Sequence, residues 1–522
     1  MPEYLSPGIY VEEVNAGPRP IEGVGTAMAA FVGFAPGGPA NKPMLITSWS
    51  QYVDTFGALE EGGKRNPYMS GSFLAHSIYG YFNNGGTRCY VTRVVPTSGK
   101  KDDAAASAQL PSRASKAIPS LTISAKGSAS SDIQVEVTRP PAEDSDEGAF
   151  TLKIKMGSSE ETFDNIILGK GGKGAKSRPL AEAVAVSQII SIVEEKTSGS
   201  LAERAPEVGT YVIKANQMTA MPMVQSSHFV GDVSDRSGLE GLEVAEDVTM
   251  LCAPDLMAAY QQGMIDKDGV KAVQLAMMNH CERVGGRMAI LDPLPDLSPQ
   301  EVKKWREKES NFDSKAAALY YPWVKVDDPL TGRPLAIPPS GHMAGVWART
   351  DAERGVWKAP ANEIARGVLE PVIQVTKGEQ DTLNPTGVNC IRSFTGMGVR
   401  VWGARTLSSD PQWRYINVRR LFNYVEKSIE RGTQWVVFEP NDMNTWERLK
   451  RDIRAFLTGT WRDGGLFGTT TAQAFFVKCD AELNPQDVRD RGQLVVEIGI
   501  APVKPAEFVV YRFQQFSEST NV

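Results

Sequence analysis

VTMLCAP (248–254) opens the stretch that decides the fold, because it is a short apolar run that ends at a proline, as buried strands do. GVKAVQLAMMNHCERVGG (269–286) follows as an amphipathic helix ended by glycines, and RMAILDP (287–293) is a second apolar strand. Strands that alternate with helices are typical of βαβ units. The stretch therefore predicts a mostly parallel sheet.

The same alternation continues on both sides of this stretch. Upstream, AMAAFVGFA (27–35) and TRCYVTRVV (87–95) are expected to be strands, and SGSFLAHSIYGYFNNGG (70–86) a helix. Downstream, SPQE (298–301) is a capping box with proline at the first helical position, which opens a helix to about residue 310. ALYYPWVKV (318–326) is expected to be one more strand.

A last α/β unit follows residue 380. Residues 413–432 form a long helical pattern, and Asn441 or Asp442 caps a second one over 443–465. Three segments are expected to be strands: TQWVVFEP (433–440), TAQAFFVKCD (471–480) and QLVVEIGIAPV (493–503).

The composition changes near residue 97. Residues 97–238 are rich in Ser, Ala, Gly, Lys and Glu and contain no tryptophan. Within them, LTISAKG (121–127), IQVEVTR (133–139) and FTLKIKM (150–156) alternate apolar and polar residues, as half-exposed antiparallel strands do. We therefore expect an inserted β-rich domain that lies at the surface.

Both ends of the sequence carry a strand-like segment. YLSPGIYVEEV (4–14) lies at the start, before a linker-like stretch, and EFVVYRFQQF (507–516) lies near the end. A lone strand is not stable, and an unpaired edge invites pairing with other chains. Both segments are thus candidates for pairing outside the parent fold.

These patterns predict an α/β (mixed α+β) inner core with an inserted β-rich outer domain and extended terminal strand arms. The expected segments are an N-terminal arm (1–25), a first core part (26–96), the inserted domain (97–238), a second core part (239–378), a C-terminal inner domain (379–505) and a C-terminal arm (506–522).

Composition excludes several classes of function. The 522 residues carry a net charge of −6, without the basic stripe of a general nucleic-acid binder. The N-terminus lacks the pattern of a signal peptide, and no apolar stretch reaches the ~18–20 residues that span a bilayer. We expect assembly in the cytoplasm without a membrane segment.

Neither a metal nor a cofactor is expected. The five cysteines and four histidines are scattered without ligand spacing, and the cysteines are expected to be buried thiols. GKGGKGAKS (169–177) approaches a phosphate-binding loop, but Ala175 stands where the pattern needs lysine. It is more simply a surface loop.

Three predicted strands end in a carboxylate beside a proline: Asp255, Asp292 and Glu439. Enzymes place catalytic groups at the carboxyl ends of parallel strands, so an α/β enzyme with these carboxylates is one alternative. The other is that they turn the chain and cap helices. No histidine, nucleophile elbow or glycine fingerprint accompanies them, so we expect no catalytic residues and no enzyme.

The helix over 443–462 has a cationic side made of Arg448, Lys450, Arg451 and Arg454. In an acidic protein, such a face can dock an acidic partner. The alternative is a solvated face with local ion pairs.

Several ordered motifs resemble the contractile tail sheath family, which includes sheaths of phage tails, R-type bacteriocins and phage-tail-like injection systems. In the C-terminal half they are PPSGHMAGVWARTDAERGVWKAPAN (338–362), GVRVWGARTLSSDPQWRYINVRRLFNYVEKSIERG (398–432), FEPND, FLTGTWRDGGLFG and PAEFVVYRF. At the front they are YLSPGIYVEEV, FVGFAPGGP and YFNNGGTRCYVTRV. The resemblance covers residues 1–96 and 240–522.

The resemblance implies a structural subunit without catalysis. Subunits of this family form stacked hexameric rings around an inner tube, and the sheath contracts after a baseplate signal to drive the tube into a target cell. The implied partners are copies of the same chain, the inner tube protein, and baseplate and tail terminator or cap proteins, without nucleic acid or membrane insertion. The particle would be a phage tail or a phage-tail-like particle.

The resemblance also implies roles for the two ends of the chain, since in this family the arms add strands to sheets of neighbouring subunits. The donors would be residues 8–14 and about 506–515, and the recipient sheet would include 472–480 and 493–503. The residues expected to exchange are Ile9, Tyr10, Val11, Phe508, Val509, Val510 and Tyr511. The cationic side of helix 443–462 would face the tube.

Overall fold

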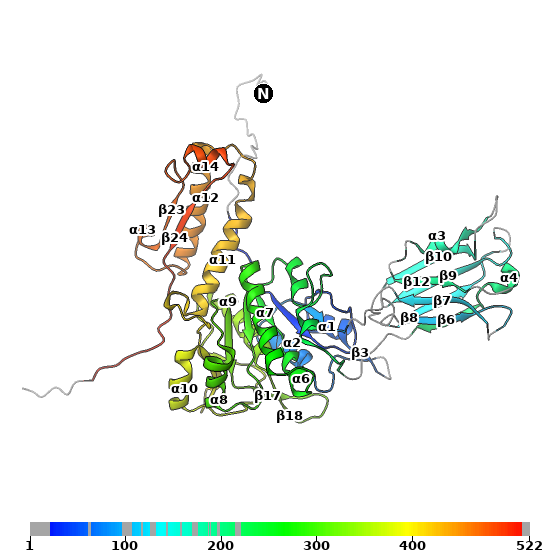
Figure 1. Cartoon of the computed structure of the whole chain (residues 1–522), viewed down its shortest axis with the longest axis horizontal. Coiled ribbons are helices and arrows are strands. Elements are labelled where there is room, and N and C mark those ends of the chain that lie inside the picture. Colours follow the sequence, from blue (N-terminus) through cyan, green and yellow to red (C-terminus); the bar gives the residue numbers. More distant parts are fainter. Residues whose placement is uncertain are drawn as a thin grey trace, which may run out of the picture. The chain divides into compact units, whose positions relative to one another are not determined.

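The computed structural model describes residues 21–60, 64–96, 107–115, 118–125, 132–141, 145–156, 159–169, 176–185, 187, 189–195, 199–213 and 221–513. The chain divides into two compact units. The larger unit comprises Ala27–Glu353 and Pro360–Ile416. Of the described residues, the smaller unit comprises 21–26, Arg354–Ala359 and 417–513. Figure 1 shows their elements coloured along the sequence.

A nine-stranded sheet organises the larger unit, in the order β19-β22-β21-β16-β15-β14-β1-β5-β2. Its six central strands are parallel: β5 (Cys89–Arg93), β1 (Ala29–Gly33), β14 (Met250–Cys252), β15 (Met288–Leu291), β16 (Ala317–Tyr321) and β21 (Val388–Phe394). Antiparallel strands lie at its margins: β2 (Met44–Ile46), β22 (Gly398–Trp402) and β19 (Glu363–Ile364). The predicted mostly parallel sheet is confirmed.

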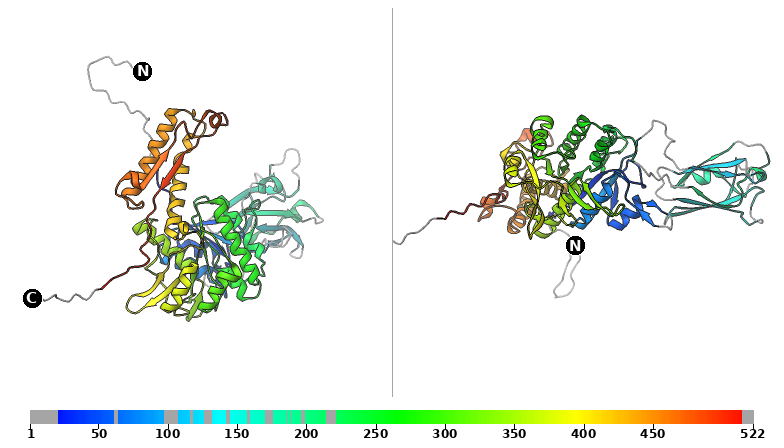
Figure 2. Two further views of the ribbon diagram at one scale, coloured as in Figure 1. Left: turned by 60° about the vertical axis from the view of Figure 1, so that its left-hand side comes forward. Right: turned by 90° about the horizontal axis from the view of Figure 1, so that it is seen from below.

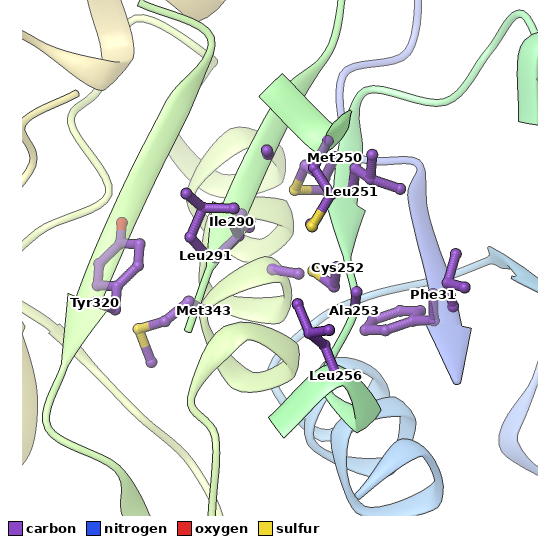
Figure 3. Packing of buried hydrophobic residues seen from close by; sticks show 14 of the residues in the cluster. Phe31, Met250, Leu251, Cys252, Ala253, Leu256, Ile290, Leu291, Tyr320 and Met343 are labelled. Carbon is purple, nitrogen blue, oxygen red and sulfur yellow. The ribbon is translucent and has the colours of Figure 1, made fainter. Parts of the chain in front are cut away.

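The core of this unit is built from the central strands and the helices that connect them. Figure 3 shows Phe31 of β1, Leu251 of β14, Ile290 of β15 and Tyr320 of β16 in this core, together with Met343 of α9. These strands are buried along their whole length, which explains why their sequences are continuous apolar runs.

Helices lie between the strands in sequence, as the alternation predicts. They are α1 (Trp49–Phe56), α2 (Leu74–Asn83), α5 (Ser226–Val230), α6 (Asp255–Gln261), α7 (Lys267–Val284), α8 (Pro299–Lys304), α9 (Ser340–Arg354) and α10 (Lys377–Leu383). The predicted capping box is present at α8: Ser298 N donates to Glu301 at 2.8 Å, and Glu301 N donates to Ser298 Oγ at 3.3 Å. The helix continues as a π-turn over Trp305–Ser310.

Two glycines let α9 pack closely against α2. A β-carbon at Gly341 would lie 2.4 Å from the Ser77 carbonyl oxygen, and one at Gly345 would lie 2.6 Å from that of Tyr81. Such distances exclude any side chain without a backbone shift. The motif SGHMAG is therefore explained by helix packing in this unit.

One strand prediction in this unit is wrong. The run 318–326 forms two strands in different sheets, because β16 ends at Tyr321 and Pro322 follows it. The second strand, β17 (Val324–Asp327), pairs with β18 (Pro334–Ile337) and β20 (Glu370–Pro371) in a separate three-stranded sheet. A proline cannot donate a ladder hydrogen bond, so a break at this residue is physically expected.

Residues 107–213 form two sheets that share an apolar core of their own. The five-stranded sheet is ordered β11 (Arg178–Pro179), β10 (Ser159–Ile167), β9 (Phe150–Met156), β8 (Ile133–Thr138) and β13 (Gly209–Ile213). The three-stranded sheet is ordered β12 (Ile190–Glu194), β7 (Pro119–Ala125) and β6 (Ser107–Pro111). Short helices α3 (Leu180–Val184) and α4 (Leu201–Arg204) accompany them.

The apolar residues of these strands alternate as the sequence predicts. In β8, Ile133, Val135 and Val137 are buried while the intervening residues are exposed. The predicted boundaries of the inserted domain stay predictions. In the structure, Val224 and Phe229 already belong to the core of the nine-stranded sheet.

The smaller unit packs two long helices against a small sheet. Its elements are α11 (Ile416–Gly432), a 3-10 turn η6 (Gln434–Val436), α12 (Met443–Arg462), α13 (Thr471–Ala474), β23 (Phe475–Lys478), α14 (Gln486–Asp490) and β24 (Glu497–Ile500). Asp442 is the N-cap of α12, and its side chain accepts a hydrogen bond from Thr445 N at 2.9 Å. The sequence left Asn441 and Asp442 as the two candidates for this cap. The core includes Leu421, Leu449, Ile453, Leu457 and Val477.

The prediction of a strand over 433–440 is wrong. Residues 434–436 form the turn η6, and Val437 and Phe438 are exposed, with Phe438 at φ 71°. Nothing in the described chain pairs with this run as a strand, and an apolar run without a neighbouring strand has no ladder to join. Glu439 therefore does not end a strand.

Candidate interface in the C-terminal unit

The sheet of the smaller unit has only two strands. β23 and β24 pair antiparallel, with Phe475 opposite Ile500 and Lys478 opposite Glu497. Among the described residues, no further strand joins either of them. One face packs on α12, where Val477 is buried beside Leu449 and Ile453. An isolated two-stranded sheet is marginal in water, so this sheet depends on its packing against α12.

The outer face of this sheet carries exposed aromatic rings. Phe476 is 53% exposed, and its ring covers Gly499, where a β-carbon would lie 2.1 Å from it. Phe467 is 71% exposed, and its backbone N–H donates to the Ala501 carbonyl at 2.8 Å. The sequence pattern did not single out these two residues, because an aromatic residue in a strand usually signals burial.

The chain after β24 is held at one point and then extends. Asn417 Nδ2 donates to the Val503 carbonyl at 3.1 Å and to the Trp357 carbonyl at 2.8 Å. Residues 503–513 have no regular secondary structure, and Figure 2 draws them as an extended trace. The strand predicted for 507–516 is thus not formed within the described part, residues 507–513.

The predicted exchange residues at this end are exposed. Phe508, Val509, Val510 and Tyr511 are 66–77% exposed, and Phe513 is 92% exposed. A row of large, exposed apolar side chains is unusual on the surface of a monomer and is typical of interaction sites. The other predicted exchange residues, Ile9, Tyr10 and Val11, lie outside the described residues.

The four cations of α12 each contact a group of the same unit. The Arg448 guanidinium lies 4.4 Å from the Trp435 ring centre, and Lys450 pairs with Glu447 at 2.7 Å. Arg451 pairs with Asp452 at 3.3 Å, and Arg454 Nη2 donates to the Val477 carbonyl at 3.2 Å. Local pairs of this kind are the alternative that the sequence left open. The tube-facing assignment of these four residues stays a prediction.

Two of the three candidate carboxylates are structural acceptors in the larger unit. Asp255 accepts from Phe34 N at 2.6 Å, Phe73 N at 2.5 Å and Ser72 Oγ at 2.9 Å. It thereby joins the end of β1 to the start of α2. Burial raises the pKa of Asp255 to about 6, although these hydrogen bonds act in the opposite direction.

Asp292 plays a similar role at the start of α9. It accepts from Ser340 N at 2.8 Å and from Ser340 Oγ at 2.6 Å, and burial raises the pKa of its carboxyl to about 7. Glu439 is exposed and belongs to the other unit. Asp255 and Asp292 are therefore buried hydrogen-bond acceptors, whereas Glu439 does not follow a strand at all.

All five cysteines are buried thiols, as predicted. Among the described residues, His, Cys, Asp and Glu side chains form no group of three or more suited to a metal ion. The described helices include none that is both long and apolar enough to cross a membrane.

Comparison with known proteins identifies the family. The profile described as phage tail sheath protein central domain matches residues 239–407, and the profile described as phage tail sheath C-terminal domain matches residues 408–516. The chain therefore belongs to the contractile tail sheath family. Members of this family are structural proteins, so the alternative of an α/β enzyme is not supported.

Individual relatives agree with this assignment. The tail sheath protein of Burkholderia phage BcepMu is 24% identical over 531 residues, covering 98% of this chain and 97% of the relative. The tail sheath protein of Vibrio phage KVP40 is 32% identical over 181 residues, which cover 34% of this chain but only 26% of that protein. The sheath complex of the extracellular contractile injection system PVC, in its contracted state, has the same fold with a TM-score of 0.56. It is 24% identical and covers 99% of both chains.

Proposed function

We propose that this chain is the sheath subunit of a contractile tail or tail-like particle, and that copies polymerise as stacked hexameric rings around an inner tube. The sheath contracts to drive the tube into a target cell. The partners are other copies of the chain, the tube protein, and baseplate and tail terminator or cap proteins. The particle assembles in the bacterial cytoplasm without nucleic acid or membrane insertion by this chain.

The observation that carries the assembly mechanism is an unfinished sheet beside an unpaired apolar tail. The β23–β24 sheet has two edges without a strand in the described chain, and residues 508–513 are exposed. The sequence provides two candidate donors, residues 8–14 and about 506–515. One donor for each edge would complete a four-stranded sheet from three copies of the chain, which is β-augmentation.

The magnitude of such a junction fits a lattice that changes pitch without separating. A backbone hydrogen bond contributes a net ~0.5–1.5 kcal/mol, and an added strand makes about five of them. Apolar burial adds ~25 cal/mol per Å². Each junction therefore contributes several kcal/mol. The linker before Phe508 can change its direction while the docked strand stays paired. Contraction energy resides in contacts between subunits, and no nucleotide is consumed.

The test of strand exchange compares the full chain with a chain that ends at residue 505. The full chain should form polymers visible by electron microscopy, and the shortened chain should stay a small species by sedimentation. At a dilution where neither chain assembles, both should unfold at about the same temperature, because residues 508–513 are exposed in the subunit. Polymerisation of the shortened chain at the same protein concentration would contradict the mechanism.

Two adjacent valines supply a matched pair for the same test. Val509 and Val510 are both exposed, but on a docked strand they point to opposite faces. Val509 shares its face with Tyr511 and Phe513, whereas Val510 shares its face with Phe508 and Arg512. Because within residues 508–513 the face with Val509 carries no charged residue, we expect it to be the buried one. Val509→Asp should therefore reduce polymerisation more strongly than Val510→Asp. Equal effects would argue against a pleated, one-sided docking.

We also propose that the exposed cations of α12 face the tube. Of the four predicted residues, Arg448, Arg451 and Arg454 are exposed and Lys450 is half-buried. Glutamate at Arg448 and Arg451 should destabilise extended particles, most strongly at low salt where charges are least screened. Extended particles that persist at every salt concentration would refute this contact.

A further inference from the structure

The two edges of the β23–β24 sheet are not equivalent. Ala501 N donates to the Ala474 carbonyl, so these two residues form a hydrogen-bonded pair at the end of the ladder. Hydrogen-bonded and non-hydrogen-bonded pairs alternate along an antiparallel ladder. The backbone groups of Phe475 and Val477 on β23, and of Ile498 and Ile500 on β24, therefore point to the outer edges.

The outer edge of β23 is covered by its own chain at two points. The Val477 carbonyl accepts from Arg454 Nη2 of α12 at 3.2 Å. The Phe475 backbone N–H donates to the Thr471 carbonyl, which closes the last turn of α13. A strand that docks on this edge needs both of these backbone groups. A charged side chain on a sheet edge also discourages pairing with another chain.

The outer edge of β24 differs, because the contact near its end lies on the opposite side of the strand. Phe467 N donates to the Ala501 carbonyl at 2.8 Å and Leu466 bridges Pro502, and the backbone groups of Ala501 point towards β23. Within the described chain, residues 497–500 pair with β23 alone, so the outward groups of Ile498 and Ile500 face no strand. The adjacent outer face is apolar through the ring of Phe476.

We infer that the β24 edge is the first docking site for a second copy of the chain, and that Arg454 keeps the β23 edge closed until then. The occupant is residues 508–513 of that second copy, which are extended and carry the exposed apolar side chains that a docked strand buries. The inference rests on the proposed strand exchange and adds an order to it. It also gives Arg454 a contact in the subunit besides its predicted place on the tube-facing side.

The order can be measured by cross-linking between two differently labelled chains. One chain carries Tyr511→Cys in its tail. The other carries either Ile500→Cys on β24 or Phe475→Cys on β23. These two positions lie opposite each other in the ladder and are both half-buried, so they are matched controls. All native cysteines are buried, which keeps the background low with a short bifunctional maleimide.

We expect the Ile500→Cys chain to cross-link to the tail at least five-fold faster than the Phe475→Cys chain during assembly. Adding Arg454→Ala should raise the Phe475→Cys rate towards the Ile500→Cys rate, whereas Arg454→Lys, which keeps a donor, should not. Thermal unfolding of each variant checks that the unit is folded.

Other outcomes would overturn either the order of docking or strand exchange itself. Equal rates at the two edges with Arg454 present, or no response to Arg454→Ala, overturn the order of docking but leave strand exchange intact. The absence of both cross-links in folded chains overturns strand exchange itself, and the order of docking with it.

Discussion

The nine-stranded sheet of the larger unit and the β23–β24 sheet of the smaller unit differ in how far the chain itself pairs their edges. The nine-stranded sheet ends in short antiparallel strands: β2 has three residues and β19 has two. Short edge strands give other chains little to pair with. The β23–β24 sheet instead leaves the backbone groups of Ile498 and Ile500 without a strand.

In the larger unit, Asp255 satisfies donors from two elements in a fully buried site, and Asn84 bridges α2 to the backbone of Arg366 at 2.8 and 2.9 Å. In the smaller unit, large apolar side chains such as Phe476 and Phe508 remain at the surface. Under the proposed strand exchange, the smaller unit supplies the contacts between copies of the chain.

The largest expected effect is the loss of the Asp255 acceptor. Asp255→Asn replaces one carboxylate oxygen by a donor that faces backbone N–H groups in a buried site, so the free energy of unfolding should fall by about 3 kcal/mol. Chemical denaturation of the chain ending at residue 505 measures this without interference from assembly. Asp266→Asn is the control: Asp266 is an exposed N-cap, and asparagine caps equally well. Equal losses from both changes would contradict the structural role of Asp255.

The second effect is a pH dependence of the same unit. Burial raises the pKa of Asp292 to about 7 in the folded state, above ~3.9 in the unfolded state. The folded protein then binds the proton more tightly, so this contribution to stability is present at low pH and is lost as pH rises through about 7. Between pH 5 and pH 8 the Asp292 carboxyl alone should lower the free energy of unfolding by about 2–3 kcal/mol. Asp292→Asn should reduce the slope by this amount, and an unchanged slope would refute the assignment.

The third effect is confined to the smaller unit. Asn484 is fully buried, and its amide donates to the Val495 carbonyl at 2.9 Å and accepts from Val495 N at 2.6 Å. Asn484→Ala leaves these backbone groups unsatisfied just before β24, at a cost of about 2 kcal/mol. Hydrogen exchange should quicken in β23 and β24, and the nine-stranded sheet should be unaffected. Faster exchange throughout the larger unit would show that the two units do not respond separately.

The smallest effect concerns a helix cap in the larger unit. Ser298→Ala removes the acceptor for Glu301 N and should lower the free energy of unfolding by about 1 kcal/mol, which thermal denaturation can measure. Ser298→Asp keeps an acceptor at the cap and should behave like the original chain. A loss from Ser298→Asp as large as that from Ser298→Ala would show that the cap is not what the serine contributes.

The parts of the fold that sequence patterns predicted are those the chain completes by itself. The buried strands around residues 248–293, the capping box at Ser298 and the cap at Asp442 follow from local periodicity and turn chemistry. Residues 433–440 and 507–513 have equally strong strand character but form no strand. Strand propensity describes fitness for a sheet and does not say whether a partner strand exists.

The hydrogen bond from Arg454 to Val477 could not be predicted either. A cation on a helix reads as surface charge, and its contact with a strand edge depends on how α12 packs on β23. Likewise, Asp255 and Asp292 were recognised as strand-end carboxylates, but only the packing of α2 and α9 makes them buried acceptors.

The hydrogen bond from Asn417 to the Val503 carbonyl fixes the start of the C-terminal tail on its own subunit. Residues 504–507 separate this fixed point from Phe508, and a fully stretched backbone spans at most ~3.3–3.6 Å per residue. A strand that begins at Phe508 therefore starts no more than about 18 Å from Val503. If residues 508–513 dock on a neighbouring copy as proposed, so short a tether would let adjacent subunits tilt and slide but would limit the gap between them.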